Sequence, residues 1–99
     1  MYIVKLAFVW DEAKNLENIK KHGVSFPEAS TIFGRIPYEI YNDPEHSEKE
    51  HRYLAIGFSD KARALLVSHT ENATGTEIRI ISARKATKKE RDDAFGGTI

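Results

Sequence analysis

Four segments in the second half of the chain, each rich in β-branched, aromatic or aliphatic residues, constrain the fold more than any other feature. They cover residues 36–41, 52–58, 64–70 and 77–82. The polar connections at residues 59–61 and 72–75 are short enough for tight turns, and a longer polar loop at residues 42–50 contains Asp43-Pro44. Because connections of this kind join antiparallel strands, the sequence predicts an antiparallel meander.

The first residues predict another strand, over residues 2–10. Its alternate positions carry Val4, Leu6, Phe8 and Trp10, which is typical of a strand with one buried face.

Three helices complete the prediction. The first begins at the cap Asp11, ends at Gly23 and has Ala13, Leu16 and Ile19 on one face. The second, over residues 26–33, follows a capping-box pair, and the third, which runs toward residue 95, follows another. The two pairs are Ser25 with Glu28 and Thr87 with Glu90.

The resulting order is β-α-α-β-β-β-β-α, an α+β fold in one domain over residues 1–99, because this length is too short for two cores. We expect an antiparallel sheet with helices covering one face. The other face would stay open. Single-stranded RNA is bound by stacking and phosphate contacts, to which an open sheet with basic side chains is suited.

The composition excludes several classes of protein. The absence of cysteine excludes a disulfide framework, and no apolar run approaches the roughly 18 residues that a membrane span requires. The N-terminus lacks the pattern of a signal peptide, so we expect a cytoplasmic protein with no membrane partner.

Charge is unevenly distributed although the net charge is zero. Residues 79–91 contain six bases and one acid, whereas residues 38–50 contain five acids and one lysine. The basic segment could bind phosphates or an acidic protein partner. The alternative is two solvated surfaces of opposite sign.

Three stretches carry a resemblance to a known family. Residues 8–29 include Lys21-His22-Gly23, residues 50–57 include Glu50-His51-Arg52, and residues 78–91 join the run from Ile78 to Thr87 to Glu90-Arg91. In this order they resemble the BrnT family of RelE-like ribonuclease toxins.

The resemblance implies a metal-independent endoribonuclease that needs no cofactor and inhibits translation. It also implies neutralisation by a BrnA-like antitoxin similar to ribbon-helix-helix proteins, which alone would contact operator DNA. The chain differs from many relatives near its end, because Ala94 stands about where they have a tyrosine, beside Phe95.

Cleavage of RNA without a metal requires a base, a proton donor and cations for the phosphate. His22, beside Lys21 at a helix end, could serve as base or acid. Alternatively, both residues complement the helix dipole.

Arginines and a lysine are the candidates for phosphate contacts. Arg79 lies between two isoleucines in a strand, so alternation points it to the open face, and Arg84 with Lys85 extends the patch. An arginine that covers apolar surface with its stem is the alternative. Arg52 shares the parity of residues 54, 56 and 58, which would turn it toward the helices, and its candidacy rests on the resemblance.

Other candidates have a structural alternative that is more typical. Glu71 and His69 could share a face at a strand end, but such a histidine is more often structural. Trp10 and Tyr53 could stack on bases, but aromatic residues in such strands usually belong to the core.

A weak metal-site pattern lies in the polar loop, which contains Glu45, His46, Glu48, Glu50 and His51. It matches no established ligand spacing, so a solvated acidic loop is the favoured interpretation.

The sequence is consistent with two functions. The leading one is an RNA-cleaving toxin. The other is a noncatalytic module, a degenerate toxin that only pairs with its antitoxin through the same basic patch.

Overall fold

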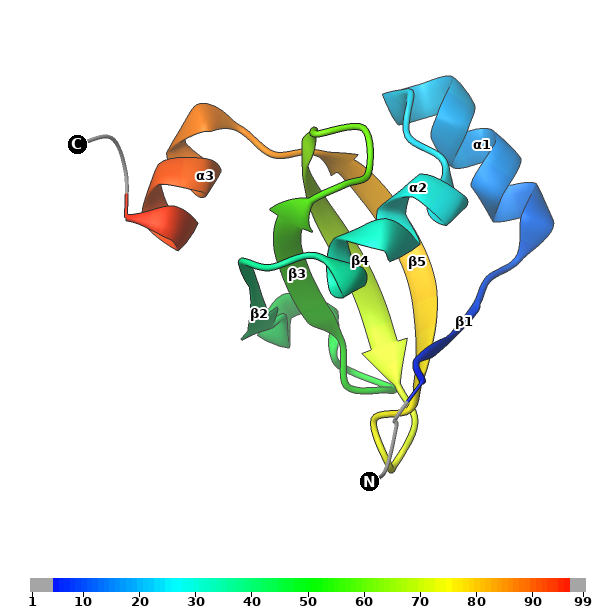
Figure 1. Cartoon of the computed structure of the whole chain (residues 1–99). Coiled ribbons are helices and arrows are strands. Elements are labelled where there is room, and N and C mark those ends of the chain that lie inside the picture. Colours follow the sequence, from blue (N-terminus) through cyan, green and yellow to red (C-terminus); the bar gives the residue numbers. More distant parts are fainter. Residues whose placement is uncertain (1–4, 97–99) are drawn as a thin grey trace.

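A computed structural model describes residues 5–96 of the chain (Figure 1). The α+β class and the predicted order of strands and α-helices are confirmed, with two additional 3-10 turns, η1 and η2. Residues 2–4 of the first predicted strand and residues 97–99 of the predicted tail lie outside the described part. The elements are β1 (Ala7–Val9), α1 (Glu12–His22), α2 (Phe26–Ser30), η1 (Thr31–Gly34), β2 (Tyr38–Asn42), η2 (Pro44–His46), β3 (Tyr53–Phe58), β4 (Ala64–Glu71), β5 (Glu77–Lys85) and α3 (Lys88–Phe95).

The five strands form one sheet in the order β1-β5-β4-β3-β2. Strands β2 to β5 are the predicted antiparallel meander. β1 joins β5 in parallel, so the sheet is mixed and the expectation of a wholly antiparallel sheet is corrected. Two strands joined by a tight turn have to be antiparallel. β1 and β5 are separated by all the other strands along the chain, so their connection allows a parallel pair.

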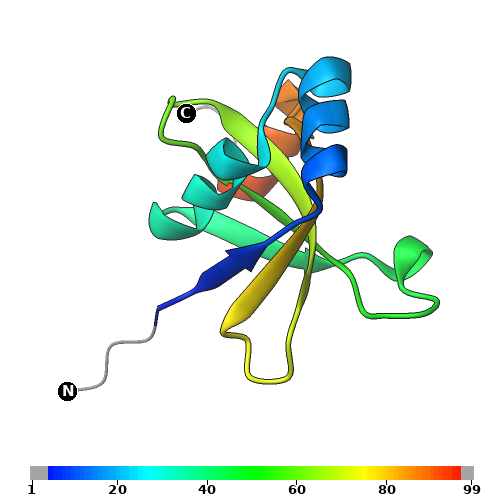
Figure 2. The same cartoon turned by 90° about the vertical axis from the view of Figure 1, so that its right-hand side faces the viewer.

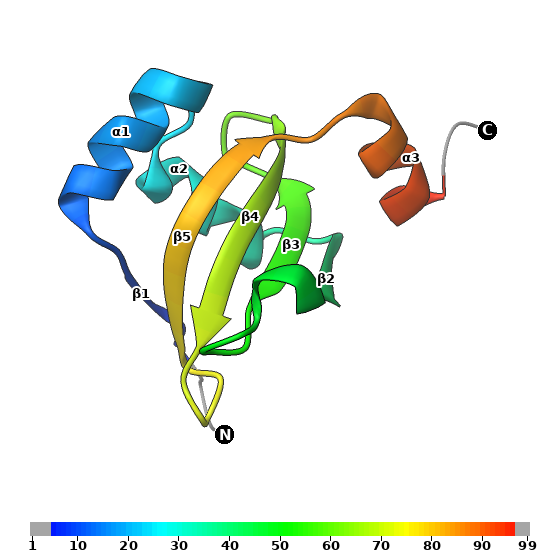
Figure 3. The same cartoon turned by 180° about the vertical axis from the view of Figure 1, so that it is seen from behind.

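The helices occupy both faces of the sheet, which corrects the expectation that all of them cover one. α2 lies in front of the sheet in Figure 1 and behind β3, β4 and β5 in the reverse view, whereas α1 lies beside the edge of β5 (Figure 3). α3 packs on the other side, where the rings of Phe95 and Phe58 are 5.3 Å apart. The outward side chains of Leu54, Ile56 and Leu66 border a hollow with α3, so this helix covers apolar surface that would otherwise meet water.

Strand β3 has its small residues toward α2 and η1. Ala55 is fully buried there, and a Cβ on Gly57 would lie 2.9 Å from Tyr38 Cβ and 3.2 Å from Ile32 Cβ. The larger residues of β3 therefore face the opposite way. Arg52 shares their parity, so the expectation that it turns toward the first helices is corrected.

Strand β5 extends three residues beyond its predicted end and contains a bulge. Ser82 pairs with Ser68 on β4, whereas Ile80 pairs with the next residue, His69, so one residue of β5, Ile81, is left over. The inward positions change from even to odd numbers across this bulge, since Ile80 and Ala83 are both buried. As a result Arg79 and Arg84 point to the same face.

α1 docks through amides rather than through its apolar face. Leu16 is 61% exposed and Ile19 is 41% exposed, whereas Asn15 and Asn18 are buried. Asn15 Oδ1 accepts a hydrogen bond of 2.8 Å from the backbone N–H of Phe26 at the start of α2. Hydrogen bonds from these amides therefore attach α1 to the rest of the fold, whereas an amphipathic helix is attached by its apolar face.

The Asn18 side chain forms hydrogen bonds with the backbone at the edge of β5 that β1 leaves unpaired. Its Nδ2 donates to the backbone oxygens of Val24 and Ala83, each at 2.8 Å, and its Oδ1 accepts from the Ala83 N–H at 3.2 Å. β1 accompanies β5 only as far as Arg79. One side chain therefore takes the place of a neighbouring strand and holds the end of α1 beside the end of β5.

A partly buried ion pair, in which only the Glu28 side chain is buried, holds the turn between α1 and α2. The Glu28 carboxylate accepts hydrogen bonds from two nitrogens of Arg63, one of them Nε at 2.9 Å, and from Ser59 Oγ at 2.7 Å. Arg63 also donates to the backbone oxygen of Gly23 at 3.1 Å. The Arg63 hydrogen bond keeps the pKa of Glu28 below its usual value.

We expect Asn18→Ala to lower the free energy of unfolding by about 2 to 4 kcal/mol, because it leaves buried backbone groups of Ala83 and Val24 without partners. Thermal and urea unfolding would measure the loss. Leu16→Ala is the control on the same helix, and its cost should stay near 0.5 kcal/mol since the side chain is exposed. Equal losses for the two variants would contradict the account of how α1 docks.

Candidate functional site

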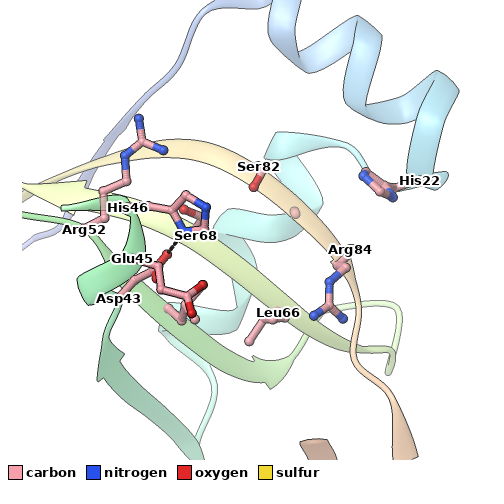
Figure 4. Close-up of a pocket in the computed structure, with 11 residues that line it drawn as sticks. His22, Asp43, Glu45, His46, Arg52, Leu66, Ser68, Ser82 and Arg84 are labelled. Atoms are coloured by element: carbon pink, nitrogen blue, oxygen red, sulfur yellow. Dashed lines mark hydrogen bonds and ion pairs between the residues drawn. The ribbon is translucent and has the colours of Figure 1, made fainter. Parts of the chain in front are cut away.

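An open groove of about 440 Å³ lies on the sheet face opposite α2, and the C-terminal end of α1 borders it. The edge-on view shows α2 and the loop that carries η2 on opposite sides of the sheet (Figure 2). Ser68 of β4 and Ser82 of β5, which are paired in the register, contribute to the floor. His46 and Arg52 approach from one side, and His22 and Arg84 from the other (Figure 4). The groove therefore joins residues from α1, η2, β4 and β5.

Arg52 has an unsatisfied hydrogen-bond donor, which is the feature of the groove that most suggests a ligand. Its Nε is buried, and no hydrogen-bond partner for it occurs among residues 5–96. A buried donor without a partner costs about 1 to 3 kcal/mol. A guanidinium in this state suits an anion with oxygens in a plane, such as a phosphate or a carboxylate.

Arg79 lies on the same face as Arg52. It pairs with Thr70 of β4, and Thr70 is one position beyond His69, the partner of Tyr53. Arg79 is exposed, and within the described residues it takes part in no ion pair. Arg52 and Arg79 therefore lie in one row across the sheet, with Thr70 between them.

Arg84 is held by α3. Its two terminal nitrogens donate to the two carboxylate oxygens of Glu90, each at 2.8 Å, and Glu90 Oε1 also accepts from the Thr87 N–H at 2.8 Å. The Arg84 hydrogen bond lowers the pKa of Glu90 to about 2. Arg84 thus borders the groove with its guanidinium already paired.

Asp43 and His46 form a hydrogen-bonded pair at the groove. Asp43 Oδ2 lies 2.9 Å from His46 Nδ1, with the carboxylate largely buried and the imidazole largely exposed. Together with His22, this places two imidazoles around one groove that also contains Arg52 and Arg84. Phosphodiester cleavage without a metal requires groups that accept and donate a proton, together with donors that hold the phosphate, and imidazoles and arginines are side chains of these kinds.

Comparison with protein families matches residues 10–90 to the family described as "Ribonuclease toxin, BrnT, of type II toxin-antitoxin system". The chain belongs to the BrnT family. The crystal structure of the Brucella abortus ribonuclease toxin BrnT is similar, with a TM-score of 0.62 and 24% identity over 84% of this chain and 99% of that one. This likeness supports the BrnT fold. A search of curated protein sequences found no match to the chain. The family implies an RNA target and an antitoxin partner.

The BrnT fold brings together five of the eight residues predicted from the sequence. His22, Arg52 and Arg84 line the main groove. Lys21 borders an adjoining hollow that His22 and Arg52 share, and Arg79 lies on the same face. Of the basic patch expected within residues 79–91, Arg84 lines the groove and Arg79 lies on the same face.

The other three predicted residues lie elsewhere in this BrnT fold. Trp10 packs on Phe26 with ring centroids 6.3 Å apart. Glu71 Oε2 is 3.3 Å from Nε2 of the buried His69, on the face that α2 covers. Lys85 pairs with the buried Leu65, so alternation directs it away from Arg84.

Asp43 and His46 are the groove residues that sequence reasoning missed. His46 was placed in a solvated acidic loop, and Asp43 was interpreted only as a turn residue. The sequence does contain a signal, since an aspartate three residues before a histidine can reach it across one turn of helix.

Two further expectations concern metals and membranes. No group of three or more metal-ligating side chains occurs within the described part of this BrnT family member. No helix among residues 5–96 is long and apolar enough to cross a membrane.

The pairing of Glu90 with Arg84 should give the BrnT fold a measurable pH dependence. The pKa of Glu90 in the folded chain is about 2, below its ordinary value of 4.5. Its stabilisation is therefore complete above about pH 4.5 and is lost as the pH falls toward 2. We expect wild type to exceed Glu90→Gln by about 1 kcal/mol in free energy of unfolding at neutral pH.

Urea unfolding of both proteins at a series of pH values would check this. The difference should shrink as the carboxylate of wild type is protonated. A difference that stays constant down to pH 2 would mean that the Glu90 charge is not the stabilising element.

Proposed function

We propose that this chain is a cytoplasmic endoribonuclease toxin that cleaves RNA without a metal ion in the groove on its open sheet face. The observation that carries the proposal is the unpartnered, buried Nε of Arg52, a residue of the groove that His22 and His46 also line. A cationic donor supplies charge stabilisation where a metal would otherwise act, and imidazoles supply proton transfer.

Phosphate binding is assigned to the row of arginines. Arg52 and Arg79 offer donors on one face, separated by the strand that contains Thr70. A phosphodiester between them would meet one guanidinium on each side. As the phosphate gains negative charge in the transition state, these donors stabilise it more than they stabilise the ground state.

Proton transfer is assigned to the histidines and not to α3. Ala94 borders an apolar hollow with Leu54 and Ile56, and Phe95 packs on Phe58. This end of the chain offers apolar contacts where many relatives have a tyrosine. His22, with Lys21 beside it to favour a nearby anion, remains as acid or base.

Neutralisation is assigned to a BrnA-like ribbon-helix-helix antitoxin, through which alone the pair would bind operator DNA. An inhibitor has to exclude RNA from the groove. The exposed Arg79 and the neighbouring arginines would attract an acidic or amphipathic segment of such a partner.

We expect purified wild type to cleave single-stranded RNA in the presence of excess EDTA, and Arg79→Ala to cleave it about 30- to 1,000-fold more slowly, because a lost transition-state contact to phosphate costs about 2 to 4 kcal/mol. The melting temperature of Arg79→Ala should remain that of wild type, since the side chain is exposed. Gel analysis of a defined RNA measures the rates.

Arg35→Ala is the matched control, because it removes an exposed arginine beyond η1 and outside the groove. Its cleavage rate should equal that of wild type. RNA that stays intact with the wild-type protein, together with unimpaired growth when the chain is expressed without its antitoxin, would support the noncatalytic module instead.

The antitoxin that the family implies should bind across Arg79 and Arg84, which share one face of the sheet, whereas Lys85, expected in the same surface, points to the other face. We expect Arg79→Glu to weaken the complex and association to slow as salt rises, because exposed charges are screened over about 10 Å at 0.1 M ionic strength. Binding kinetics at several salt concentrations measure both effects. A complex that leaves these residues exposed and covers only the acidic side would contradict this surface.

A further inference from the structure

The Asp43–His46 pair differs from an ordinary surface pair in how it is held. The Asp43 side chain is 10% exposed, whereas that of His46 is 61% exposed. The buried carboxylate cannot move to another partner without desolvation cost. The imidazole is therefore fixed at one nitrogen and open at the other.

The backbone around the pair ties it to Arg52. The Asp43 N–H donates to the Arg52 oxygen at 2.9 Å, and the Arg52 N–H donates to Ser47 Oγ at 3.0 Å. Ser47 Oγ in turn donates to the Asp43 oxygen at 2.6 Å. This closed set of hydrogen bonds holds the imidazole and the base of the arginine side chain in one rigid unit, as catalytic geometry requires.

The hydrogen bond also determines which imidazole nitrogen is available. A carboxylate can only accept, so Nδ1 of the neutral ring carries the proton and donates it to Asp43 Oδ2. Nε2 then has a free lone pair. Because His46 lines the groove, that lone pair is available to a ligand there.

We propose that His46 is the general base of the cleavage reaction and that Asp43 is its positioning residue. This inference rests on the proposed ribonuclease function. His46 Nε2 takes the proton of a ribose 2′-hydroxyl, the 2′-oxygen bonds to phosphorus, and the bond from phosphorus to the 5′-oxygen breaks. His22, in its protonated form, gives its proton to the leaving 5′-oxygen. The products are a 2′,3′-cyclic phosphate and a 5′-hydroxyl, and water restores both imidazoles.

The charged groups that share the groove fit this assignment. Arg52 and Arg84 are cationic, and Glu45 is the one further acid that lines it with Asp43. The adjoining hollow adds Glu48, Lys49 and Glu50. The arginines offer donors to the phosphate, and the hydrogen bond to Asp43 leaves Nε2 of His46 as the free ring nitrogen.

The test uses the whole purified chain and an RNA oligonucleotide with one cleavable site. His46→Ala should lower the cleavage rate about 100- to 10,000-fold, and wild type should leave a 2′,3′-cyclic phosphate and fail on a substrate with a 2′-deoxy sugar at that site. His51→Ala is the matched control, because His51 is an exposed histidine of the same loop that bonds to Asn42 and does not line the groove. It should cleave at the wild-type rate. His46→Gln serves as a second variant in case the alanine protein fails to fold.

Nitrogen NMR of the histidine ring provides a readout that does not depend on activity. At a pH where imidazoles are neutral, wild-type His46 should carry its proton on Nδ1, and Asp43→Asn should shift the proton toward Nε2 and slow cleavage. An Nε2–H ring in wild type would overturn the assignment of the base.

The outcomes separate the two proposals. Full activity of a folded His46→Ala or His46→Gln, with wild type active in EDTA, would overturn the role of His46 and leave the ribonuclease function intact. Inactive wild type would overturn both.

Discussion

The contact between Asn18 and Ala83 is the interaction on which the site depends. It joins α1 to the last part of β5 on the edge opposite β4, where β1 no longer pairs with β5. Without it, the helix end that carries His22 would lose its anchor to the strand that carries Ser82 and Arg84. A single amide suffices because it offers a donor and an acceptor in the spacing of a peptide group.

The bulge in β5 is the second constraint, because it determines which side chains share a face. An unbroken strand would send Arg79 and Arg84 to opposite faces, since their numbers differ by an odd count. The unpaired Ile81 corrects this offset. Arg79 and Arg84 therefore share the face on which the groove lies, although Arg84 is held by Glu90 and Arg79 remains exposed.

Part of the candidate site followed from local pattern and part did not. Arg79 was correctly placed on the open face because the isoleucines on both sides of it are buried. Arg52 was assigned the wrong face, because alternation along β3 defines two sets of residues without saying which set meets α2. The close approach of η1 to Gly57 decides that question, and it is a contact between distant parts of the chain.

The sequence by itself determined the order of the elements, their caps and turns, and the family, because these depend on neighbours within a few residues or on motifs that can be matched directly. Only the tertiary structure decided that β1 is parallel to β5, that α3 lies opposite α2, and that the Asp43–His46 pair meets His22 across a groove. The physical reason is that local propensities set the elements, whereas packing and the pairing of buried polar groups decide which surfaces meet.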